Sequence, residues 1–272
     1  MRKKLSDMIL ILIFVVGLSL LLYPSISDYW NSIHQSRAIN TYAQDVAELD
    51  NSVYTKILEE AHAYNKKLAQ NNYLRRLSED ELEDYNNQIK ISTDGVMSCI
   101  EIPAINCTLP IYHGTGEAVL QVAVGHIEGT SLPVGGENTH CVLSGHRGLP
   151  SAKLFSDLDQ LKEGDVFMLQ TLGDTLTYEV DQIRIVLPHE VGDLKIIENE
   201  DLCTLVTCTP YGINSHRLLI RGHRIENLDD SLNIRVSADA MQIDPVMVAP
   251  VLAIPVLLVL VIWVLIYYRR RN

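Results

Sequence analysis

The sequence predicts a mainly β domain, a closed barrel or a sandwich, that follows a helical segment and lies between two apolar blocks of the 272-residue chain. Two observations predict the β fold. Seven short apolar and β-branched runs follow one another from residue 95 onward, each bounded by Gly, Pro, Asn or Asp. In one run Leu176, Tyr178 and Val180 alternate with polar residues, which is the period of a half-buried strand. Many short strands with few helices are typical of barrels and sandwiches.

The first apolar block, residues 8–23, contains no charged residue and follows Arg2, Lys3 and Lys4. A bilayer span takes about 20 residues, and this block is shorter. A cleaved signal peptide, which has a shorter apolar core than a membrane span, is therefore the competing interpretation. The following stretch, YPSISDYWNS, has no clear pair of small residues before a cleavage site. We therefore favour a retained transmembrane anchor over residues 8–23, with residues 1–7 as a cytoplasmic tail.

Residues 24–94 have the pattern of a helical region. Apolar residues recur at steps of three and four, which places them on one helix face; they are Tyr42, Val46, Leu49, Val53, Ile57, Ala61, Tyr64 and Leu68. We expect this stripe to pack on the β domain, and a coiled-coil dimer is the alternative. Ser78 lies three residues before Glu81, which is the pattern of a capping box and predicts a second, short helix.

The second apolar block, residues 246–268, is long enough to cross a bilayer and precedes three arginines. Its two prolines are tolerated in membrane helices. Basic residues lie outside both blocks, so the positive-inside rule predicts two transmembrane helices in the cell membrane, with residues 1–7 and 269–272 in the cytoplasm and residues 24–245 outside. The net charge is −12, and the part between the basic ends is more acidic still, which argues against nucleic acid as a partner.

The predicted strands define a β domain over residues 95–226, followed by a linker over 227–245. The seven runs are VMSCIEIP, CTLPIYHG, THCVLSGH, DVFMLQTL, TLTYEVDQIRIVL, LCTLVTC and HRLLIRG. The segment Ser151–Leu161, in the loop after the third run, is expected to form a short helix.

Five cysteines in an extracellular chain leave at least one thiol unpaired. We interpret Cys99, Cys107, Cys141 and Cys203 as small core residues, because free cysteine is among the most buried residue types. A disulfide such as Cys99 with Cys107 stays open. The sequence contains no Cys-x-x-Cys pair, so no metal site is predicted.

Cys208 is the candidate nucleophile. It ends an apolar, β-branched run just before Pro210 and Gly212, and the returning run carries Arg217. A guanidinium near a thiol favours the thiolate, which is the nucleophilic form. His146 follows the end of another run. A thiol, an imidazole and a guanidinium at strand ends are the groups that acyl transfer needs for attack, proton transfer and oxyanion stabilisation.

The motifs around these residues resemble the sortases, cysteine transpeptidases of Gram-positive bacteria. TLVTC, residues 204–208, is similar to the T-L-x-T-C signature of the family. SGHRGLPSAKLF and TPYGINSHRLLIRGHR resemble the class C, pilus-assembling branch. The resemblance runs from about Ile100 to Arg224, and it implies the eight-stranded sortase β-barrel without a cofactor.

Carried over position by position, the resemblance implies that Cys208 is the nucleophile, His146 the proton-transfer residue and Arg217 the transition-state stabiliser. Thr207 and Thr209 flank the nucleophile, and their backbone amides or hydroxyls are candidates for holding the oxyanion.

Class C sortases commonly carry a lid with an Asp-Pro-aromatic tripeptide before the barrel. This chain has no proline between Pro24 and Pro103, so it departs from that pattern. The segment Asn71–Thr93 occupies the corresponding place, and Tyr73 and Tyr85 are the candidate lid residues. The absence of any lid is the equal alternative.

Other basic side chains near these motifs are expected to be structural. His113 and His126 lie beside turns, while His140 and His216 point away from the candidate site by strand alternation. Arg221 matches no catalytic position of the family.

The activity that the resemblance implies is transpeptidation outside the membrane. A Leu-Pro-x-Thr-Gly-like sorting signal would be cleaved through a Cys208 thioester and transferred to a pilin lysine, so the partners would be pilins or surface proteins that bear such signals. Transfer to a cell-wall peptide amine is the alternative within the family. A membrane-tethered scaffold or adhesin domain, with Cys208 merely buried, is the non-enzymatic alternative.

Overall fold

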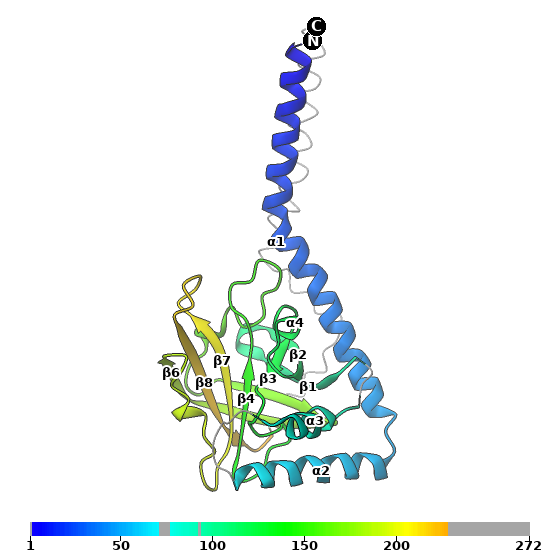
Figure 1. The fold of residues 1–272 in the computed structure, drawn as a ribbon, viewed down its shortest axis with the longest axis vertical. Coiled ribbons are helices and arrows are strands. Elements are labelled where there is room, and N and C mark those ends of the chain that lie inside the picture. The colour runs from blue at the N-terminus through cyan, green and yellow to red at the C-terminus, as the bar shows by residue number, and fades with distance from the viewer. Residues whose placement is uncertain (1, 71–76, 92–93, 228–272) are drawn as a thin grey trace.

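A closed β-barrel is the central feature of the computed structural model, which describes residues 2–70, 77–91 and 94–227 (Figure 1). The strand order around the barrel is β1-β2-β3-β4-β7-β8-β6-β5, with β2–β3 and β4–β7 as parallel pairs. The strands are β1 (Val96–Ile102), β2 (Cys107–His113), β3 (Val124–His126), β4 (Thr139–Ser144), β5 (Val166–Thr171), β6 (Asp174–Val186), β7 (Asp201–Thr209) and β8 (His216–Ile225). The predicted eight-stranded barrel is confirmed.

All seven strands that the sequence predicts are present, and the pattern missed β3. With three residues, β3 is too short to show a period of two. The predicted helix over Ser151–Leu161 is wrong, because this segment forms turns and only Leu158–Gln160 makes a single 3₁₀ turn. Leu154 has a φ of 38°, a left-handed conformation that a right-handed helix does not contain.

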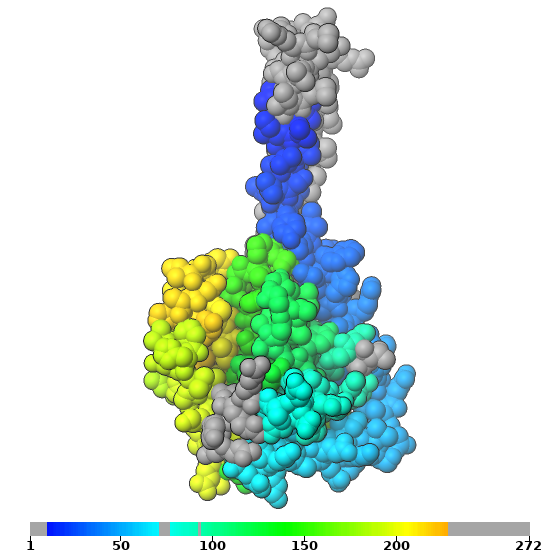
Figure 2. All heavy atoms as spheres, viewed as in Figure 1, coloured from blue at the N-terminus to red at the C-terminus, as the bar shows by residue number. Residues whose placement is uncertain are grey.

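Helix α1 runs without interruption from Arg2 to Ala47. The sequence predicts an anchor over residues 8–23 and a separate helical region after it, but Pro24 lies inside one continuous helix. A proline removes one backbone N–H and crowds the preceding turn, which commonly kinks a helix. The helix bends on its way out from the barrel (Figure 1), and its N-terminal half projects from the rounded body (Figure 2).

Two shorter helices, α2 (Asn51–Ala69) and α3 (Glu79–Asn87), connect α1 to the barrel. Asp50 caps α2, because its carboxylate accepts a hydrogen bond from the backbone N–H of Ser52 at 2.8 Å. The predicted capping box at α3 is confirmed: Ser78 Oγ accepts from the Glu81 N–H, and the Glu81 carboxylate accepts from the Ser78 N–H at 2.9 Å. A single turn, α4 (Glu117–Leu120), precedes β3.

The predicted helical stripe packs on the barrel, which confirms the expectation that the helices cover the β domain. Tyr42 is buried between α1 and the sheet, where its hydroxyl donates to the Met97 carbonyl (3.1 Å) and accepts from the Leu172 N–H (2.9 Å). On α2, Ala61 is fully buried, and Ile57 and Tyr64 pack against the same core.

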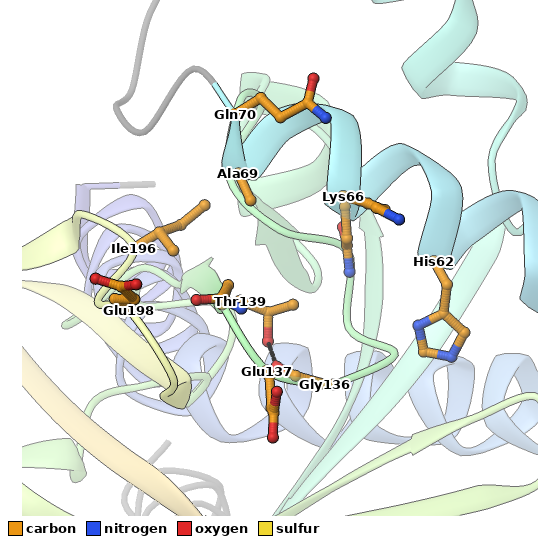
Figure 3. Close-up of a pocket in the computed structure, with 12 residues that line it drawn as sticks. His62, Lys66, Ala69, Gln70, Gly136, Glu137, Thr139, Ile196 and Glu198 are labelled. Carbon is orange, nitrogen blue, oxygen red and sulfur yellow. Dashed lines mark hydrogen bonds between the residues drawn. The ribbon is translucent and has the colours of Figure 1, made fainter.

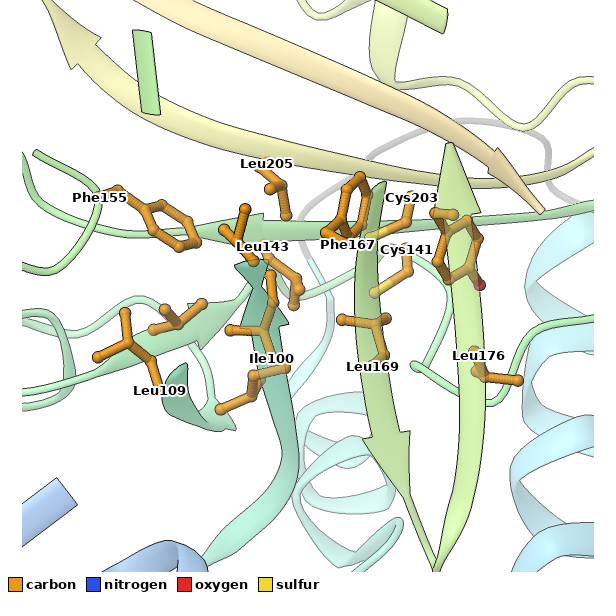
Figure 4. Packing of buried hydrophobic residues seen from close by; sticks show 14 of the residues in the cluster. Ile100, Leu109, Cys141, Leu143, Phe155, Phe167, Leu169, Leu176, Cys203 and Leu205 are labelled. Atoms are coloured by element: carbon orange, nitrogen blue, oxygen red, sulfur yellow. The ribbon is translucent and has the colours of Figure 1, made fainter. Parts of the chain in front are cut away.

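Strands β4 and β7 present two apolar faces. One face points into the barrel, where Cys141, Leu143, Cys203 and Leu205 belong to the main core (Figure 4). The other face points outward, and its alternating residues form a second cluster with residues of β6, of β8 and of the loop after β6. The cluster consists of Val142, Val186, Leu194, Val206 and Leu219. The even-numbered residues of β7 are therefore on the outer face, as strand alternation requires.

One helix among the described residues is long and apolar enough to cross a bilayer, and it is α1. Its apolar side chains from Leu10 to Tyr23 are almost all exposed. Apart from Asn227, the predicted linker 227–245 lies outside the described residues, and so do the predicted transmembrane helix 246–268 and the predicted tail 269–272.

Candidate active site

Cys208 and Arg217 lie directly opposite each other in the antiparallel pair β7–β8. Opposite residues in such a pair hold their Cβ atoms about 5 Å apart, with both side chains on one face. Both residues are half-buried. Nη1 of Arg217 donates to the carbonyl oxygens of Asn214 (3.2 Å) and His216 (3.1 Å), which holds the guanidinium near the end of the strand. The thiol and the guanidinium thus lie on the same, outer side of the barrel wall.

His146 reaches the same level from the neighbouring strand. Ser144 is the register partner of Val206 in the parallel pair β4–β7. His146 and Cys208 each lie two residues further along the chain, so they are level with each other. The pairing continues past the end of β4, because the Gly145 N–H donates to the Val206 carbonyl at 3.1 Å. The His146 side chain is 29% exposed, so the imidazole is accessible to solvent and to a substrate.

The backbone around His146 is held from both sides. The Gly145 carbonyl accepts a hydrogen bond from Thr207 Oγ1 (2.8 Å), and the His146 carbonyl accepts one from the Phe155 N–H (3.1 Å). A Cβ on Gly145 would lie 2.6 Å from the Phe155 ring, so only glycine fits here without rearrangement. The imidazole therefore projects from a tightly packed base next to the residue that precedes Cys208.

Arg147 connects the loop of His146 to the loop of Cys208, and the sequence reasoning did not single it out. Its Nη1 donates to Thr209 Oγ1 at 3.4 Å, and its guanidinium carbon lies 5.9 Å from the ring centroid of Tyr211. It also forms an ion pair with Asp159. With its side chain only 10% exposed, Arg147 bridges the segments that follow His146 and Cys208. The sequence feature that could have identified Arg147 is its position directly after His146.

Glu117, at the start of α4, is a second residue that the sequence reasoning missed. Its Oε2 lies 4.0 Å from Nε2 of His146. The carboxylate is 73% exposed, so solvent screens the interaction and its direct energetic contribution is small. Glu117 nevertheless supplies a negative charge and a hydrogen-bond acceptor on the imidazole side of the site.

Both threonines that flank the nucleophile are buried, and their hydroxyls are engaged. The Thr207 hydroxyl donates to Gly145, and the Thr209 hydroxyl accepts from Arg147. These hydroxyls therefore hold the two loops in place. Oxyanion stabilisation by the backbone amides of the same residues stays a prediction.

The one candidate lid residue that the structure describes, Tyr85, is not found over Cys208. Tyr85, on α3, is fully buried in the main core, whereas Cys208 is on the outer face of β7. The Tyr85 hydroxyl lies 2.9 Å from His126 Nδ1 and accepts from the Gly114 N–H at 3.0 Å, so Tyr85 fastens α3 to the barrel. This placement corrects the expectation of a lid role for Tyr85. Tyr73 lies outside the described residues.

His113, His140 and Arg221 make structural contacts. Burial lowers the pKa of His113 and of His140 to about 4, so both are neutral at pH 7. His113 Nε2 lies 2.9 Å from a backbone carbonyl, and His140 Nδ1 lies 2.8 Å from the Lys195 carbonyl. Arg221 donates two hydrogen bonds, of 3.0 and 2.9 Å, to the carboxylate of Asp181.

All five cysteines are free thiols, so the disulfide between Cys99 and Cys107 is absent. Burial raises the pKa of both thiols to about 12, which keeps them protonated. Cys141 and Cys203 are register partners inside the barrel, with their sulfurs side by side (Figure 4). Burial raises the pKa of Cys203 well above its ordinary value. Cys99, Cys141 and Cys203 are buried core residues, as the sequence predicts, whereas Cys107 is half-buried and packs against the main core.

A cavity of about 630 Å³ lies at the opposite end of the barrel, between α2 and the loops that lead into β4 and β7 (Figure 3). His62, Lys66, Glu137 and Glu198 contribute to its lining. Thr139, the first residue of β4, also lines it, and the six-residue strand separates it from the His146 end by about 17 Å. The cavity and the Cys208 site are therefore distinct.

The chain is similar to known sortases in sequence and in structure. A family model described as "Sortase domain" matches residues 100–225. Sortase D of Bacillus subtilis (strain 168) is 32% identical over 139 residues, which are 50% of this chain and 67% of the relative. The crystal structure of sortase C1 from Streptococcus agalactiae is 52% identical, with a TM-score of 0.69, and the match covers 71% of this chain and all of that one.

Sortase C from Streptococcus pneumoniae is a third similar protein, with 43% identity and a TM-score of 0.64 over 70% of this chain and 97% of that chain. The two solved neighbours are both sortases C, which agrees with the motifs around His146 and Cys208. The chain therefore belongs to the sortase family and is a cysteine transpeptidase whose structural neighbours support class C.

Proposed function

We propose that this protein is a membrane-anchored class C sortase that joins pilin subunits, with Cys208 as nucleophile, His146 as proton-transfer residue and Arg217 as transition-state stabiliser. The observation that carries the proposal is the register of three strands. Cys208 is paired with Arg217 across β7–β8, and His146 is level with Cys208 across β4–β7. This arrangement supports a shared site on the outer face of the barrel.

In the first half-reaction, the Cys208 thiolate attacks the carbonyl carbon of the threonine in a Leu-Pro-x-Thr-Gly-like signal. Arg217 donates hydrogen bonds to the oxyanion of the tetrahedral intermediate, where fixed donors are most effective. The bond from the threonine carbonyl to the glycine nitrogen then breaks, and His146 protonates the departing amine. The product is a thioester between Cys208 and the threonine.

In the second half-reaction, an acceptor amine attacks the thioester carbonyl. His146 removes a proton from the attacking nitrogen, the carbon–sulfur bond breaks, and the Cys208 thiolate is regenerated. The acceptor that we propose is a pilin lysine, so that repeated cycles build a covalent polymer. Sortase C from Streptococcus pneumoniae, to which this chain is similar, is described with pilin substrate specificity, and this likeness supports the acceptor.

The exposed apolar run of α1 supports membrane attachment. Side chains such as Leu12, Leu20 and Leu21 are more than 60% exposed, and a bilayer would remove them from water. The β7–β8 end of the barrel faces the same side as the projecting half of α1 (Figure 1). A tethered enzyme in this orientation meets membrane-held substrates at high effective concentration. The second span, 246–268, and the cytoplasmic location of both termini remain predictions.

Competition between acceptors tests the pilin proposal. The full-length protein in lipid nanodiscs is incubated with a sorting-signal peptide and equal amounts of a pilin domain and a cell-wall peptide amine. We expect the peptide acyl group on a pilin lysine, identified by mass spectrometry. Transfer mainly to the wall peptide would instead support the anchoring alternative.

Membership of an enzyme family contradicts the non-enzymatic scaffold. Product formation that persists in Cys208→Ala would contradict the proposed mechanism.

A further inference from the structure

Three polar side chains on one face of α1 hold loops of the barrel. Asp28, Asn31 and Gln35 are spaced by three and four residues, so they lie above one another along the helix. Each is half-buried, and each binds a backbone group of the barrel more than 80 residues away in sequence. Asp28 Oδ1 accepts from the Lys153 N–H (2.7 Å), Asn31 Nδ2 donates to the Ser151 carbonyl (2.8 Å) and Gln35 Nε2 donates to the Val122 carbonyl (2.7 Å).

Two of these bonds hold the loop that begins at His146. The loop closes on itself, because the Phe155 N–H donates to the His146 carbonyl at 3.1 Å and Leu149 forms a β-bridge with Ala152. Ser151 and Lys153 lie within the closed part. A displacement of these two residues would therefore also displace the His146 backbone, from which the imidazole projects.

The third bond holds the segment on the other side of the imidazole. Val122 lies between α4 and β3, two residues beyond the end of α4. The first residue of α4 is Glu117, whose carboxylate is 4.0 Å from His146 Nε2. One face of α1 thus contacts both segments that adjoin the His146 side chain.

The rest of α1 gives this face a fixed position. Tyr42 is buried and bonded to backbone groups of β1 and of the β5–β6 turn; it lies about two helical turns beyond Gln35 and about four beyond Asp28. Loops on their own are among the most mobile parts of a protein, whereas a helix anchored to the core is rigid. Side chains from such a helix can hold a loop within the small tolerance that catalysis requires.

We propose that Asp28, Asn31 and Gln35 form a clamp by which the anchor helix positions His146 for proton transfer. They are positioning residues, because they act through the backbone of two loops and do not touch the reacting atoms. The inference rests on the proposed function in so far as His146 is the proton-transfer residue. It makes α1 a part of the active-site scaffold in addition to a membrane anchor.

The test compares two sets of variants of the full-length protein in nanodiscs. The clamp set is Asp28→Ala with Asn31→Ala and Gln35→Ala, alone and combined. The matched control is Ser36→Ala with Asn40→Ala, which changes exposed positions of the same helix. Two readouts are measured well below the unfolding midpoint of every variant: kcat and KM for a sorting-signal peptide, and the pH dependence of Cys208 alkylation by iodoacetamide.

We expect the combined clamp variant to lose about tenfold or more in kcat while KM changes less than twofold, because displacement of a catalytic group by about 1 Å is costly. The pH profile of alkylation should also shift, since the reactivity of the thiol depends on the nearby imidazole. Asp28→Asn keeps the acceptor oxygen and should retain activity where Asp28→Ala does not. The control should match the wild type in both readouts.

A clamp variant with wild-type kcat and a wild-type alkylation profile would overturn the proposal, and so would an equal loss in the control. If the combined variant does not fold, the single variants and the pair Asp28→Asn and Asp28→Ala decide the question. If the wild type cleaves no sorting peptide, the proposed function fails. The alkylation profile does not use a substrate and still tests the clamp.

Discussion

Strand β7 carries two cysteines, Cys203 and Cys208, which differ in burial and in their neighbours. Cys203 is fully buried in the barrel interior next to Cys141, and burial raises its pKa well above the ordinary value. Cys208 is half-buried on the outer face, opposite Arg217 and level with His146. The five-residue spacing puts the two thiols on opposite faces. Under the proposed function, the two thiols differ in reactivity because of the strand face on which each lies and the neighbours on that face, since the residue type is the same.

The two ends of the barrel show the same contrast. The end with the 630 Å³ cavity is where α2 meets the loops, and its buried polar groups have hydrogen-bond partners: Asn65 donates to the Leu132 carbonyl and accepts from the Leu132 N–H. The Cys208 end, by contrast, carries the partly exposed thiol, imidazole and guanidinium. A large cavity is therefore a poorer guide to chemistry here than the convergence of functional groups.

Replacing each of the two cysteines by alanine, one at a time, gives the largest expected difference in activity. Cys208→Ala should lose at least about 1,000-fold in cleavage of a sorting peptide, because no nucleophile remains. Cys203→Ala should keep kcat within twofold but lower the free energy of unfolding by about 1 to 2 kcal/mol through the cavity it leaves. Peptide cleavage and urea unfolding measure the two effects. Equal loss of activity in both variants would contradict the assignment of the nucleophile to the outer face of β7.

The two arginines of β8 sharpen the comparison. Arg217→Lys should lower kcat by about 100-fold, because lysine keeps the charge but loses the planar set of donors. Arg221→Lys should leave kcat nearly unchanged and cost stability, since Arg221 forms a two-bond ion pair with Asp181. Steady-state kinetics and thermal unfolding of both variants provide the measurement. A larger loss of kcat in the Arg221 variant would contradict the assignment.

The bridge made by Arg147 should have an intermediate effect. Arg147→Met removes the contacts to Thr209, Asp159 and Tyr211, and we expect about a tenfold loss of kcat because the two catalytic loops are no longer tied together. Arg184→Met is the matched control, since Arg184 forms a more exposed ion pair with Asp193. Rates of thioester formation compare the two. Indistinguishable rates would show that the bridge does not position the site.

The smallest effect concerns acid stability. Burial lowers the pKa of His140 to about 4 from the ordinary 6.5, so the unfolded chain binds this proton more readily than the folded one. His140 should therefore contribute a loss of stability as the pH falls from about 6.5 to 4, amounting to at most about 3 kcal/mol. Urea unfolding at several pH values checks this. His140→Gln should flatten the dependence, whereas the same change at the exposed His189 should not.

Much of the fold followed from local patterns. Seven strands, the helical stripe and the capping box at Ser78 were predicted because each depends on residues that are near in sequence. The three-residue β3 offered too little periodicity, and the left-handed Leu154 broke a helix that the composition favoured. Continuity of α1 through Pro24 was missed because proline is normally a sign of interruption.

The site divides in the same way. The motifs around His146, Cys208 and Arg217 were visible in the sequence, and strand alternation placed His140 and His216 away from them. Arg147 and Glu117 were missed because their roles depend on contacts across different loops. Tyr85 was interpreted as a lid candidate from its place in the chain, but its hydroxyl finds partners inside the barrel, at His126 and Gly114. Such pairings depend on tertiary packing, which has no local signature.

Trapping the covalent intermediate tests the central claim most directly. The full-length enzyme is mixed with a sorting-signal peptide in the absence of acceptor, quenched in acid within seconds and digested for mass spectrometry. We predict an added mass equal to the peptide up to its threonine, located on Cys208, sensitive to hydroxylamine and absent in Cys208→Ala. Cleavage of the peptide without this adduct, or with the adduct on Cys107, Cys141 or Cys203, would contradict the account.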